Sequence, residues 1–461
     1  MREPITLLSD KALGRLNERL PREPFDDDGA VVSGIIDDDK SRGAFRTPAQ
    51  RDRDRLLYCS ALQRLGGVTQ VTGSESGYTF HTRLTHSLKV AQVARRCAEK
   101  LLQERDTGAL SGRAARALDG VDPDAAEAAG LAHDLGHPPF GHVAEEVLRD
   151  DTPAGFEGNP QSFRIVTKLA VRKLDAPGLS LTRRTLNGIL KYPWPRETEN
   201  LKKKYKWGAY EPDLAAFKWV RHDSQSDEPS LIARIMDWAD DVTYAVHDLQ
   251  DFYQAGLVPL HLLCADSDGK KELARFEEGL HAAGREDLET RIEAVSEVLG
   301  LAGIDESFEG RDDQRAALRA MASMLITKYL GAFTIEDGPR EGCAEVVIDP
   351  AARMQVDALK DLTWVYVVRR PSLAVMQAGK REIIRRLCEW YLKATSGDGD
   401  ESRLLPLAYQ HRLHAAQTDE ARSRLVNDLV SGLTEDAALT LFRRMSGVDP
   451  GSVIDAVARL R

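Results

Sequence analysis

The chain has 461 residues, of which 42% are hydrophobic and 30% are charged, and its formal net charge is −10. This composition is that of an ordinary globular protein and excludes wholesale disorder. The net negative charge argues against broad, nonspecific binding to nucleic acid or to an anionic membrane, because such binding needs a basic face.

The N-terminal sequence MREPITLLSDKALGRL lacks the continuous apolar stretch of a secretory signal. No later run approaches the roughly 18 apolar residues that a membrane-spanning helix needs. We therefore expect a cytoplasmic protein that has no membrane partner.

The residue pattern divides the chain into three predicted parts. Residues 1–50 carry the acidic clusters FDDDG and IDDDK, and are predicted to be an N-terminal arm that orders against another element or subunit. Helical spacing begins in RDRDRLLYCSALQRL, so residues 51–255 are predicted to be a helical core. Residues 256–461 are predicted to be a helical C-terminal region with a small β-hairpin near 331–350, where β-branched runs flank a turn-forming centre. The expected fold class is mostly α.

Within the predicted core, four helix starts can be located from capping residues. Thr85 is expected to cap a helix that begins at the next residue. Asp122 and Pro123 occupy the cap and the first helical position of an alanine-rich helix, which a glycine and two prolines then end. A third helix begins near His142, and a long fourth helix spans residues 230–256.

The segment HDLGHPPFGH (133–142) concentrates three of the chain's 11 histidines beside an aspartate. Together with His86 and Asp240, its residues His133 and Asp134 would lie at helix ends or on helix faces, and they form a predicted metal site. Mixed histidine and carboxylate ligation suits Mn, Mg, Fe, Co, Ni or Zn, and the residue types do not choose among these ions. Phosphoester hydrolysis is the natural reaction of such a site.

Asp240, Tyr244 and Asp248 repeat every four residues, so we expect them to share one face of their helix. Taken singly, each such residue is more often a capping, core or solvated residue than a functional one. Spacing alone therefore leaves both the structural and the functional interpretation open.

Six motifs in order resemble those of the HD-domain deoxynucleoside triphosphate triphosphohydrolases, in particular the bacterial dGTPase-like branch. The motifs are RDRDR (51–55), VTQV (68–71), TRLTHSLKV (82–90), HDLGHPPFGH (133–142), FEGNPQ (156–161) and ADDVTYAVHDLQD (239–251). The resemblance is densest over residues 51–255 and implies that they form an HD-type catalytic core. It also implies an HD-domain helical fold and a divalent metal held by His86, His133, Asp134 and Asp240.

The family reaction implied by the resemblance is attack of water on the α-phosphorus, which releases a deoxynucleoside and tripolyphosphate; dGTP is a candidate for the preferred substrate. The resemblance assigns His142 as the general acid and Glu145, one helical turn later, as the carboxylate that orients it. His137 is a second candidate, for the α-phosphate or for support of the metal. Glu157 of FEGNPQ is a shared residue with an orienting role.

A substrate with close to four negative charges needs a local cationic pocket in an acidic protein. The expected substrate-binding residues are Arg64, Gln70, Arg83, Lys206, Tyr244 and Asp248. The three cations would bind phosphate. The resemblance further implies that Tyr244 excludes a 2′-hydroxyl, that Asp248 accepts a hydrogen bond from the 3′-hydroxyl, and that Gln70 contacts the sugar or the base.

The resemblance also implies a homo-oligomer, as a tetramer or hexamer, and a nucleotide effector. One alternative is another HD phosphohydrolase, a nucleotidase or phosphodiesterase, although such an enzyme would need only the metal motifs. A second alternative is a nucleotide-sensing or single-stranded nucleic-acid-binding protein, suggested by the basic, aromatic run LKKKYKW at residues 201–207.

Overall fold

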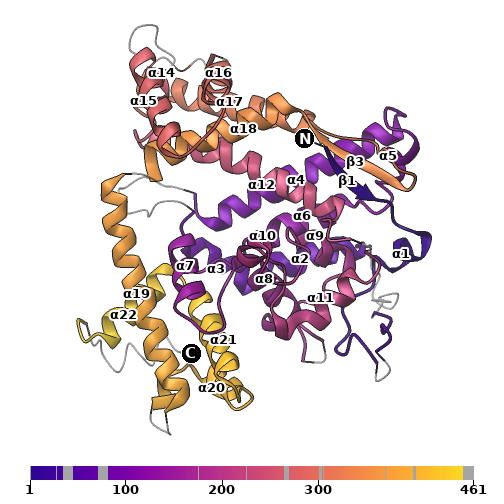
Figure 1. Ribbon diagram of the computed structural model, residues 1–461, viewed down its shortest axis with the longest axis vertical. Helices are drawn as coiled ribbons and strands as arrows, with labels where there is room; N and C mark the ends of the chain where they lie inside the picture. The colour runs from indigo at the N-terminus through magenta and orange to yellow at the C-terminus, as the bar shows by residue number, and fades with distance from the viewer. Residues whose placement is uncertain are drawn as a thin grey trace.

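The computed structural model describes residues 2–26, 29–34, 45–70, 81–174, 176–224, 226–263, 269–300, 304, 306–368, 370–397 and 401–449. The acidic cluster IDDDK, part of FDDDG and the segment 71–80 lie outside the described residues. The expectation of a mostly helical fold with a small β element is confirmed (Figure 1).

The helices of the first half are α1 (Asp10–Arg15), α2 (Pro48–Leu57), α3 (Ser60–Arg64), η2 (Leu65–Gly67), α4 (Arg83–Asp106), α5 (Gly112–Arg116), α6 (Pro123–Ala132), α7 (His142–Asp150), α8 (Gly158–Arg164), η4 (Ile165–Leu169), α9 (Arg183–Ile189), α10 (Leu201–Tyr205), η5 (Glu211–Asp213) and α11 (Leu214–Arg221). Those of the second half are α12 (Leu231–Thr243), η6 (Tyr244–Asp248), α13 (Leu249–Gln254), α14 (Leu260–Leu263), α15 (Gly269–Ala282), α16 (Leu288–Gly300), α17 (Asp312–Gly331), α18 (Pro350–Thr363), η7 (Trp364–Val368), α19 (Pro371–Ser396), η8 (Glu401–Leu404), α20 (Leu407–Leu413), α21 (Asp419–Ser431) and α22 (Glu435–Met445).

Helices α4, α6 and α12 form the centre of the main hydrophobic core, and α2 and α9 pack against α6. Helix α6 is alanine-rich and buried on nearly all sides, so it can approach its neighbours closely. A Cβ atom at Gly130 would lie only 2.6 Å from the Cα atom of Ala91 on α4, so only glycine permits this crossing. The close crossing brings His133, at the end of α6, opposite His86 on α4.

The capping predictions are partly correct. Asp122 caps α6 with Pro123 in its first turn, as expected, and α7 begins at His142. The expected cap at Thr85 is wrong, because α4 begins at Arg83 and is capped by Thr82, whose side-chain oxygen accepts a hydrogen bond from the backbone N–H of Thr85. The earlier start places Arg83 in the first turn of the helix.

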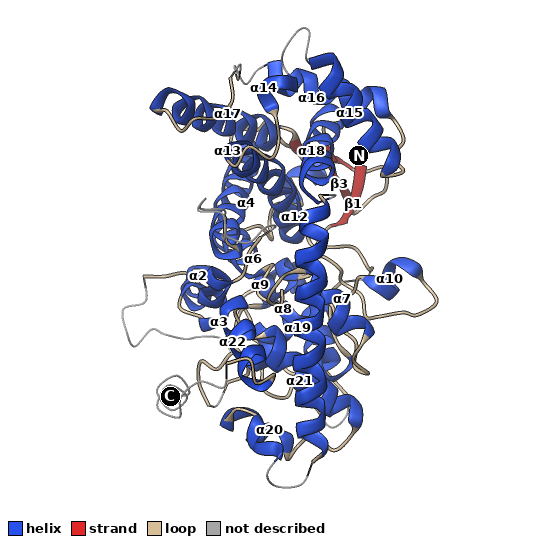
Figure 2. Ribbon diagram, turned by 90° about the vertical axis from the view of Figure 1, so that its left-hand side faces the viewer, coloured by secondary structure: helices blue, strands red, loops and turns tan. Residues whose placement is uncertain are grey.

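A three-stranded antiparallel sheet has the order β1-β3-β2, from β1 (Arg2–Thr6), β2 (Phe333–Asp337) and β3 (Cys343–Ile348). The predicted hairpin near 331–350 is β2 with β3. The arm adds the third strand, with Arg2 opposite Val347 and Thr6 opposite Cys343. The sheet lies at the periphery, beside α18 (Figure 2).

A second hydrophobic core joins the two halves of the chain. It includes Phe140, Leu148 and Phe156 from the part of the chain at 51–255, packed against residues of α19 and α21. Helix α19 runs along one side of the molecule in Figure 1 and contributes Leu387 and Tyr391 to this second core. Among the described residues, no helix is both long enough and apolar enough to cross a membrane.

A buried ion-pair network fixes α21 to helices within residues 51–255. The Arg164 Nη1 atom lies 2.8 Å from Asp213 Oδ1, and its Nη2 atom lies 2.9 Å from Asp428 Oδ2. All three side chains are at most 9% exposed. Lys168 Nζ also lies 3.7 Å from Asp213 Oδ1, so Arg164 is the cation shared by both carboxylates and Asp213 has a second one.

We expect Arg164→Met to lower the free energy of unfolding by about 3–5 kcal/mol, because it removes the cation between two buried carboxylates and breaks the ion pair of Asp428. Urea unfolding monitored by circular dichroism measures the loss. Arg386→Met is the control, since Arg386 is paired with Glu382 and Glu389 on the surface. Equal losses in the two variants would contradict the prediction.

Candidate functional site

Three predicted metal ligands converge between α4, α6 and α12. The His86 Nε2 atom lies 3.0 Å from Asp240 Oδ1, and the His133 Nε2 atom lies 3.6 Å from the same oxygen. The ligand atoms of His86, His133 and Asp240 all lie within 4.8 Å of one another. Two imidazole nitrogens and a carboxylate oxygen at this separation fit a divalent cation.

The hydrogen bonds of His133 prepare its ring for ligation. Its Nδ1 atom donates to the carbonyl oxygen of Gly130 at 2.7 Å, which leaves the lone pair on Nε2. That Nε2 atom is buried and, among the described residues, has no hydrogen-bond partner. A buried nitrogen without a partner costs free energy unless a ligand uses it, so the orphaned atom supports the metal assignment.

Asp134 adjoins this cluster, with its Oδ1 atom 3.5 Å from His133 Nε2. Its other oxygen, Oδ2, accepts a hydrogen bond from Arg83 Nη1 at 2.6 Å. Burial alone would raise the pKa of Asp134, but His133, His137 and Arg83 together hold that pKa well below its usual range. The carboxylate is therefore ionised, as a metal ligand must be.

His142 and Glu145 form a pair at the start of α7. The His142 Nδ1 atom lies 2.9 Å from Glu145 Oε2, and the other oxygen of Glu145 accepts the backbone N–H of Gly158 at 2.9 Å. The His142 side chain is 74% exposed, whereas that of Glu145 is 8% exposed. Burial favours the neutral acid, but the hydrogen bond with His142 and the charges of His137 and Lys206 keep the pKa of Glu145 far below its usual range.

Glu157 and Lys206 form a second pair beside Glu145. The Lys206 Nζ atom lies 2.7 Å from Glu157 Oε1 and 3.9 Å from Glu145 Oε1. Burial and the charge of Glu145 raise the pKa of Glu157 to about 7, although Lys206 opposes this shift. Glu157 also caps α8 by accepting the backbone N–H of Asn159.

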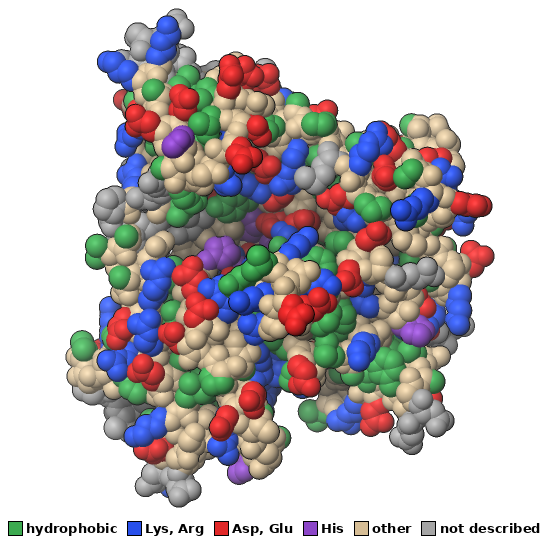
Figure 3. Space-filling model, viewed as in Figure 1, with side chains coloured by type: hydrophobic (Ala, Val, Ile, Leu, Met, Phe, Trp, Pro, Cys, Tyr) green, Lys and Arg blue, Asp and Glu red, His purple; other side chains and the backbone are tan. Residues whose placement is uncertain are grey.

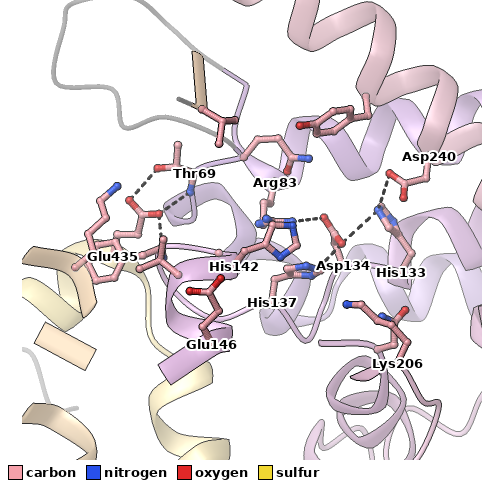
Figure 4. Close-up of a pocket in the computed structure, with 18 of the residues that line it drawn as sticks. Thr69, Arg83, His133, Asp134, His137, His142, Glu146, Lys206, Asp240 and Glu435 are labelled. Atoms are coloured by element: carbon pink, nitrogen blue, oxygen red, sulfur yellow. Dashed lines mark hydrogen bonds and ion pairs between the residues drawn. The ribbon is translucent and has the colours of Figure 1, made fainter. Parts of the chain in front are cut away.

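A cavity of about 500 Å³ connects these groups. It opens in a hollow on the face shown in Figure 3. The predicted residues that line it are Gln70, Arg83, His133, Asp134, His137, His142, Lys206, Asp240 and Tyr244. Figure 4 shows Asp240 and His133 on one side of the cavity, Glu435 and Thr69 on the other, and His142 between them.

The remaining predicted residues lie behind the cavity wall. His86, Glu145 and Glu157 contact residues that line it, as described above. Arg64 does not line it; its Nη2 atom donates to the carbonyl oxygens of Leu135 and His137, each at 2.8 Å. In this structure Arg64 holds the backbone of the HDLGH turn, because its donors are used by carbonyl oxygens rather than left for phosphate.

Asp248 is also buried behind the wall, at 3% exposure. The predicted continuous helix contains a π-helical turn, η6, between Tyr244 and Asp248, and such turns are frequent at functional sites. Burial, together with the charge of Asp251, raises the pKa of Asp248 well above its usual value. Its Oδ2 atom has no hydrogen-bond partner in the described part of the chain.

Sequence reasoning missed several residues that line the cavity. Lys191 and Tyr192 belong to KYPW, which could have been a signal, and Asn159 belongs to FEGNPQ. Thr69, Phe140, Gly141, Val143, Glu146 and Met236 lie in or beside the predicted motifs. Five more come from the C-terminal region and carried no local signal: Val368, Gln377, Lys380, Arg381 and Glu435.

Glu435 closes the end of the cavity away from the metal ligands. Its Oε1 atom accepts the backbone N–H groups of Thr69 at 2.9 Å and of Phe140 at 3.2 Å. Phe140 has a φ of 67°, which is unfavourable for a residue with a side chain, and Gly141 follows with a φ of 60°. The C-terminal helix α22 thus holds the strained turn that presents His142.

The basic run at 201–207 offers less to nucleic acid than its sequence suggests. Trp207 is 1% exposed, so its ring cannot stack on a base. Lys203 is paired with Glu197 at 2.7 Å and with Asp227 at 2.8 Å. Tyr205 remains exposed, with the Arg149 guanidinium 5.7 Å from the centre of its ring.

Comparison with known proteins agrees with this geometry. The HD domain model matches residues 83–245, and the model of the phosphohydrolase-associated domain matches residues 346–444. HD domains bind divalent metals, and the cluster of His86, His133 and Asp240 lies in the matched region.

Several curated relatives share the name deoxyguanosinetriphosphate triphosphohydrolase-like protein. One from Corynebacterium efficiens is 35% identical over 422 residues, which cover 87% of this chain and 92% of the relative. One from Streptomyces coelicolor is 34% identical over 445 residues, covering 93% of this chain and 98% of the relative. A third, from Shewanella halifaxensis, is 30% identical over 464 residues, which cover 91% of this chain and 96% of the relative. With its HD fold and a likeness that extends over nearly the whole length, the chain belongs to the family of deoxyguanosinetriphosphate triphosphohydrolase-like HD proteins.

Proposed function

We propose that this protein hydrolyses deoxynucleoside triphosphates to a deoxynucleoside and tripolyphosphate, by attack of water at the α-phosphorus. The observation that carries the proposal is that His142, which is hydrogen-bonded to Glu145, lines the same cavity as His133 and Asp240 of the metal-binding cluster. A metal-binding cluster and an oriented histidine on one cavity are the groups that phosphoester cleavage requires. The names of the relatives make dGTP the first substrate to test.

His86, His133, Asp134 and Asp240 are the proposed ligands of the divalent cation. When bound there, the cation would supply Lewis acidity toward a phosphate oxygen and lower the pKa of water. Arg83, Lys191 and Lys206 line the cavity and supply positive charge for the triphosphate. Arg83 has a second task, because it also holds Asp134.

His142 is the proposed general acid. Its Nδ1 atom is committed to Glu145, so its Nε2 atom is left to protonate the departing 5′-oxygen. Glu145 is a positioning residue that is fixed by the backbone of Gly158. His137, which lies 3.0 Å from Asp134 Oδ1, and Glu157, which is held by Lys206, are proposed to orient the groups around the α-phosphate.

The sugar is proposed to bind beside Tyr244 and Gln70, which both line the cavity. Gln70 Oε1 is buried and has no partner among the described residues, so it can accept a hydrogen bond from a ligand. Asp248 would reach the 3′-hydroxyl only if substrate binding rearranges the wall near Tyr244. Assembly as a tetramer or hexamer and activation by a nucleotide stay predictions from the resemblance.

Tyr244→Ala is expected to raise the turnover of ribonucleoside triphosphates relative to the deoxy forms by on the order of tenfold, because it removes the ring that would clash with a 2′-hydroxyl. The measurement is the ratio of kcat/KM for GTP and dGTP in the variant and in the parent protein. Tyr205→Ala, on exposed α10, is the control. An unchanged ratio would remove Tyr244 from sugar selection.

The proposal as a whole is tested by incubating the purified protein with each deoxynucleoside triphosphate and its ribose counterpart, in buffer with Mn²⁺ or Mg²⁺. Phosphorus NMR and chromatography identify the products. Deoxynucleoside with tripolyphosphate is the expected pair. Release of orthophosphate or pyrophosphate instead would show that another bond is broken and would overturn the proposal.

A further inference from the structure

The turn between α6 and α7, which carries His142, has a backbone that does not hold its shape unaided. Phe140 and Gly141 both have positive φ angles, of 67° and 60°. A residue with a side chain keeps such a conformation only where its surroundings fix it. The contacts made by Phe140 therefore bear on where His142 is placed.

The start of the C-terminal helix α22 holds this turn from two directions. Arg64, whose Nη2 atom binds carbonyl oxygens of the HDLGH turn, also donates from Nη1 to the carbonyl oxygen of Leu433 at 3.1 Å. Two residues later, Glu435 Oε1 accepts the backbone N–H of Phe140 at 3.2 Å. The stretch from Leu433 to Glu435 is thus bonded to both ends of the turn.

Glu435 also holds a second wall of the cavity. Its Oε1 atom accepts the backbone N–H of Thr69 at 2.9 Å, and its Oε2 atom accepts the Thr69 hydroxyl at 2.8 Å (Figure 4). Thr69 precedes Gln70 and forms a β-bridge with Thr82, the residue that caps α4. One carboxylate therefore joins the segment of Gln70 to the turn of His142.

Packing fixes the position from which Glu435 acts. Thr434 caps α22 by accepting the backbone N–H of Ala437 at 3.2 Å. A Cβ atom at Gly67 would lie only 2.8 Å from Thr434 Cγ2, so the start of α22 sits directly against η2. Ala438 is fully buried in the second hydrophobic core. The carboxylate is therefore carried by a helix end that has little freedom to move.

We propose that Glu435 is a positioning residue of the active site, which supports catalysis by fixing the turn that carries the general acid His142. This inference rests on the proposed hydrolysis. Both oxygens of Glu435 are engaged by Thr69 and Phe140, so Glu435 acts through them rather than on the substrate. It also gives the segment that matches the phosphohydrolase-associated domain, residues 346–444, a direct part in the reaction.

The first test compares three substitutions of Glu435. Glu435→Ala is expected to lower kcat by about 10- to 100-fold and to retain the bound metal, because a displacement of about 1 Å at a reacting group costs up to that much. Glu435→Asp should lose kcat in the same way, because its shorter side chain cannot reach both partners. Glu435→Gln should stay within about threefold of the parent protein, since its amide oxygen still accepts both N–H groups and its amide nitrogen can donate to the Thr69 hydroxyl.

The matched control is Asp436→Ala, which removes an exposed carboxylate from the same turn of α22 and should leave kcat unchanged. Equal unfolding midpoints establish that the variants fold. Parent-like kcat in Glu435→Ala would overturn the inference. Glu435→Gln as slow as Glu435→Ala would also overturn it, because the charge of Glu435, and not its hydrogen bonds, would then be what catalysis needs.

A double-mutant cycle tests whether Glu435 acts through His142. In the His142→Ala background, Glu435→Ala should lower kcat by less than about threefold further, because the group that it positions is already absent. Disturbance of Gln70 would appear in KM instead, so the cycle is measured on kcat. Losses that multiply fully would show that Glu435 acts independently of His142 and would overturn the assignment.

Hydrogen exchange gives a readout that needs no turnover. Glu435→Ala should raise the exchange rate of the Phe140 amide at least about tenfold, measured by mass spectrometry on peptides that span residues 138–145, while Asp436→Ala keeps the parent rate. An unchanged rate in Glu435→Ala would show that Glu435 does not hold the turn. If the protein hydrolysed no deoxynucleoside triphosphate, the proposed function would fail, and hydrogen exchange would still decide whether Glu435 holds the turn of His142.

Discussion

His133→Ala is expected to lose its bound divalent metal and roughly 10³-fold in kcat, since metal Lewis acidity contributes several kcal/mol and each 1.4 kcal/mol is a factor of ten. The ring is fixed by the carbonyl oxygen of Gly130, and its Nε2 atom has no hydrogen-bond partner among the described residues, which leaves its lone pair for the metal. Elemental analysis after dialysis measures the metal, and chromatography of the products measures the rate.

The control for this variant is His222→Ala, which removes an exposed histidine at the end of α11. It should keep both metal and activity. Asp240→Asn should resemble His133→Ala, because Asp240 Oδ1 faces both imidazoles. If His133→Ala bound metal at full stoichiometry, or hydrolysed dGTP at the parent rate, the ligand assignment would be wrong.

His142→Ala is expected to lower kcat by about 10²- to 10⁴-fold while the bound metal is retained, because general acid catalysis contributes in that range. Glu145→Gln should have a smaller effect of the same kind, since it keeps the histidine but weakens the hydrogen bond that orients it. The relevant measurements are kcat, KM and metal content for each variant.

A substrate analogue with sulfur in place of the bridging 5′-oxygen separates acid catalysis from positioning. A thiolate departs without protonation, so the analogue should be hydrolysed by His142→Ala at close to the parent rate. If the variant were equally slow with the oxygen and the sulfur substrates, His142 would not be the proton donor. Its role would then be to position the phosphate.

The position of His133 in the cluster could be predicted from the sequence because this residue sits at a recognisable helix end. The Asp122–Pro123 start and the HDLGHPP stop fix the end of α6, and α7 begins at the expected residue. The close approach of α6 to α4 at Gly130 could not be predicted, because it depends on which residues of α4 pack against this glycine. Arg64 is a related case, because nothing in a motif shows that its donors face backbone carbonyl oxygens in this structure.

The far end of the cavity could not be predicted, because its residues come from distant parts of the chain. Glu435 contacts Thr69 and Phe140 across roughly 300 residues or more, and this pairing has no local pattern. The π-helical turn at Tyr244 could not be predicted either, because the same residues also fit a regular α-helix.

The sheet has a consequence for how the protein is made. Strand β1 pairs with β3, so Ile5 finds its partner Ala344 only after more than 300 further residues have been synthesised. At translation rates of about 5–20 residues per second, that wait is roughly 15–70 s. During that time all the residues of α4, α6 and α12 can leave the ribosome and pack. The first strand of the chain therefore joins the fold later than α4, α6 and α12, and until then it is an unpaired strand that a chaperone or another nascent chain could bind.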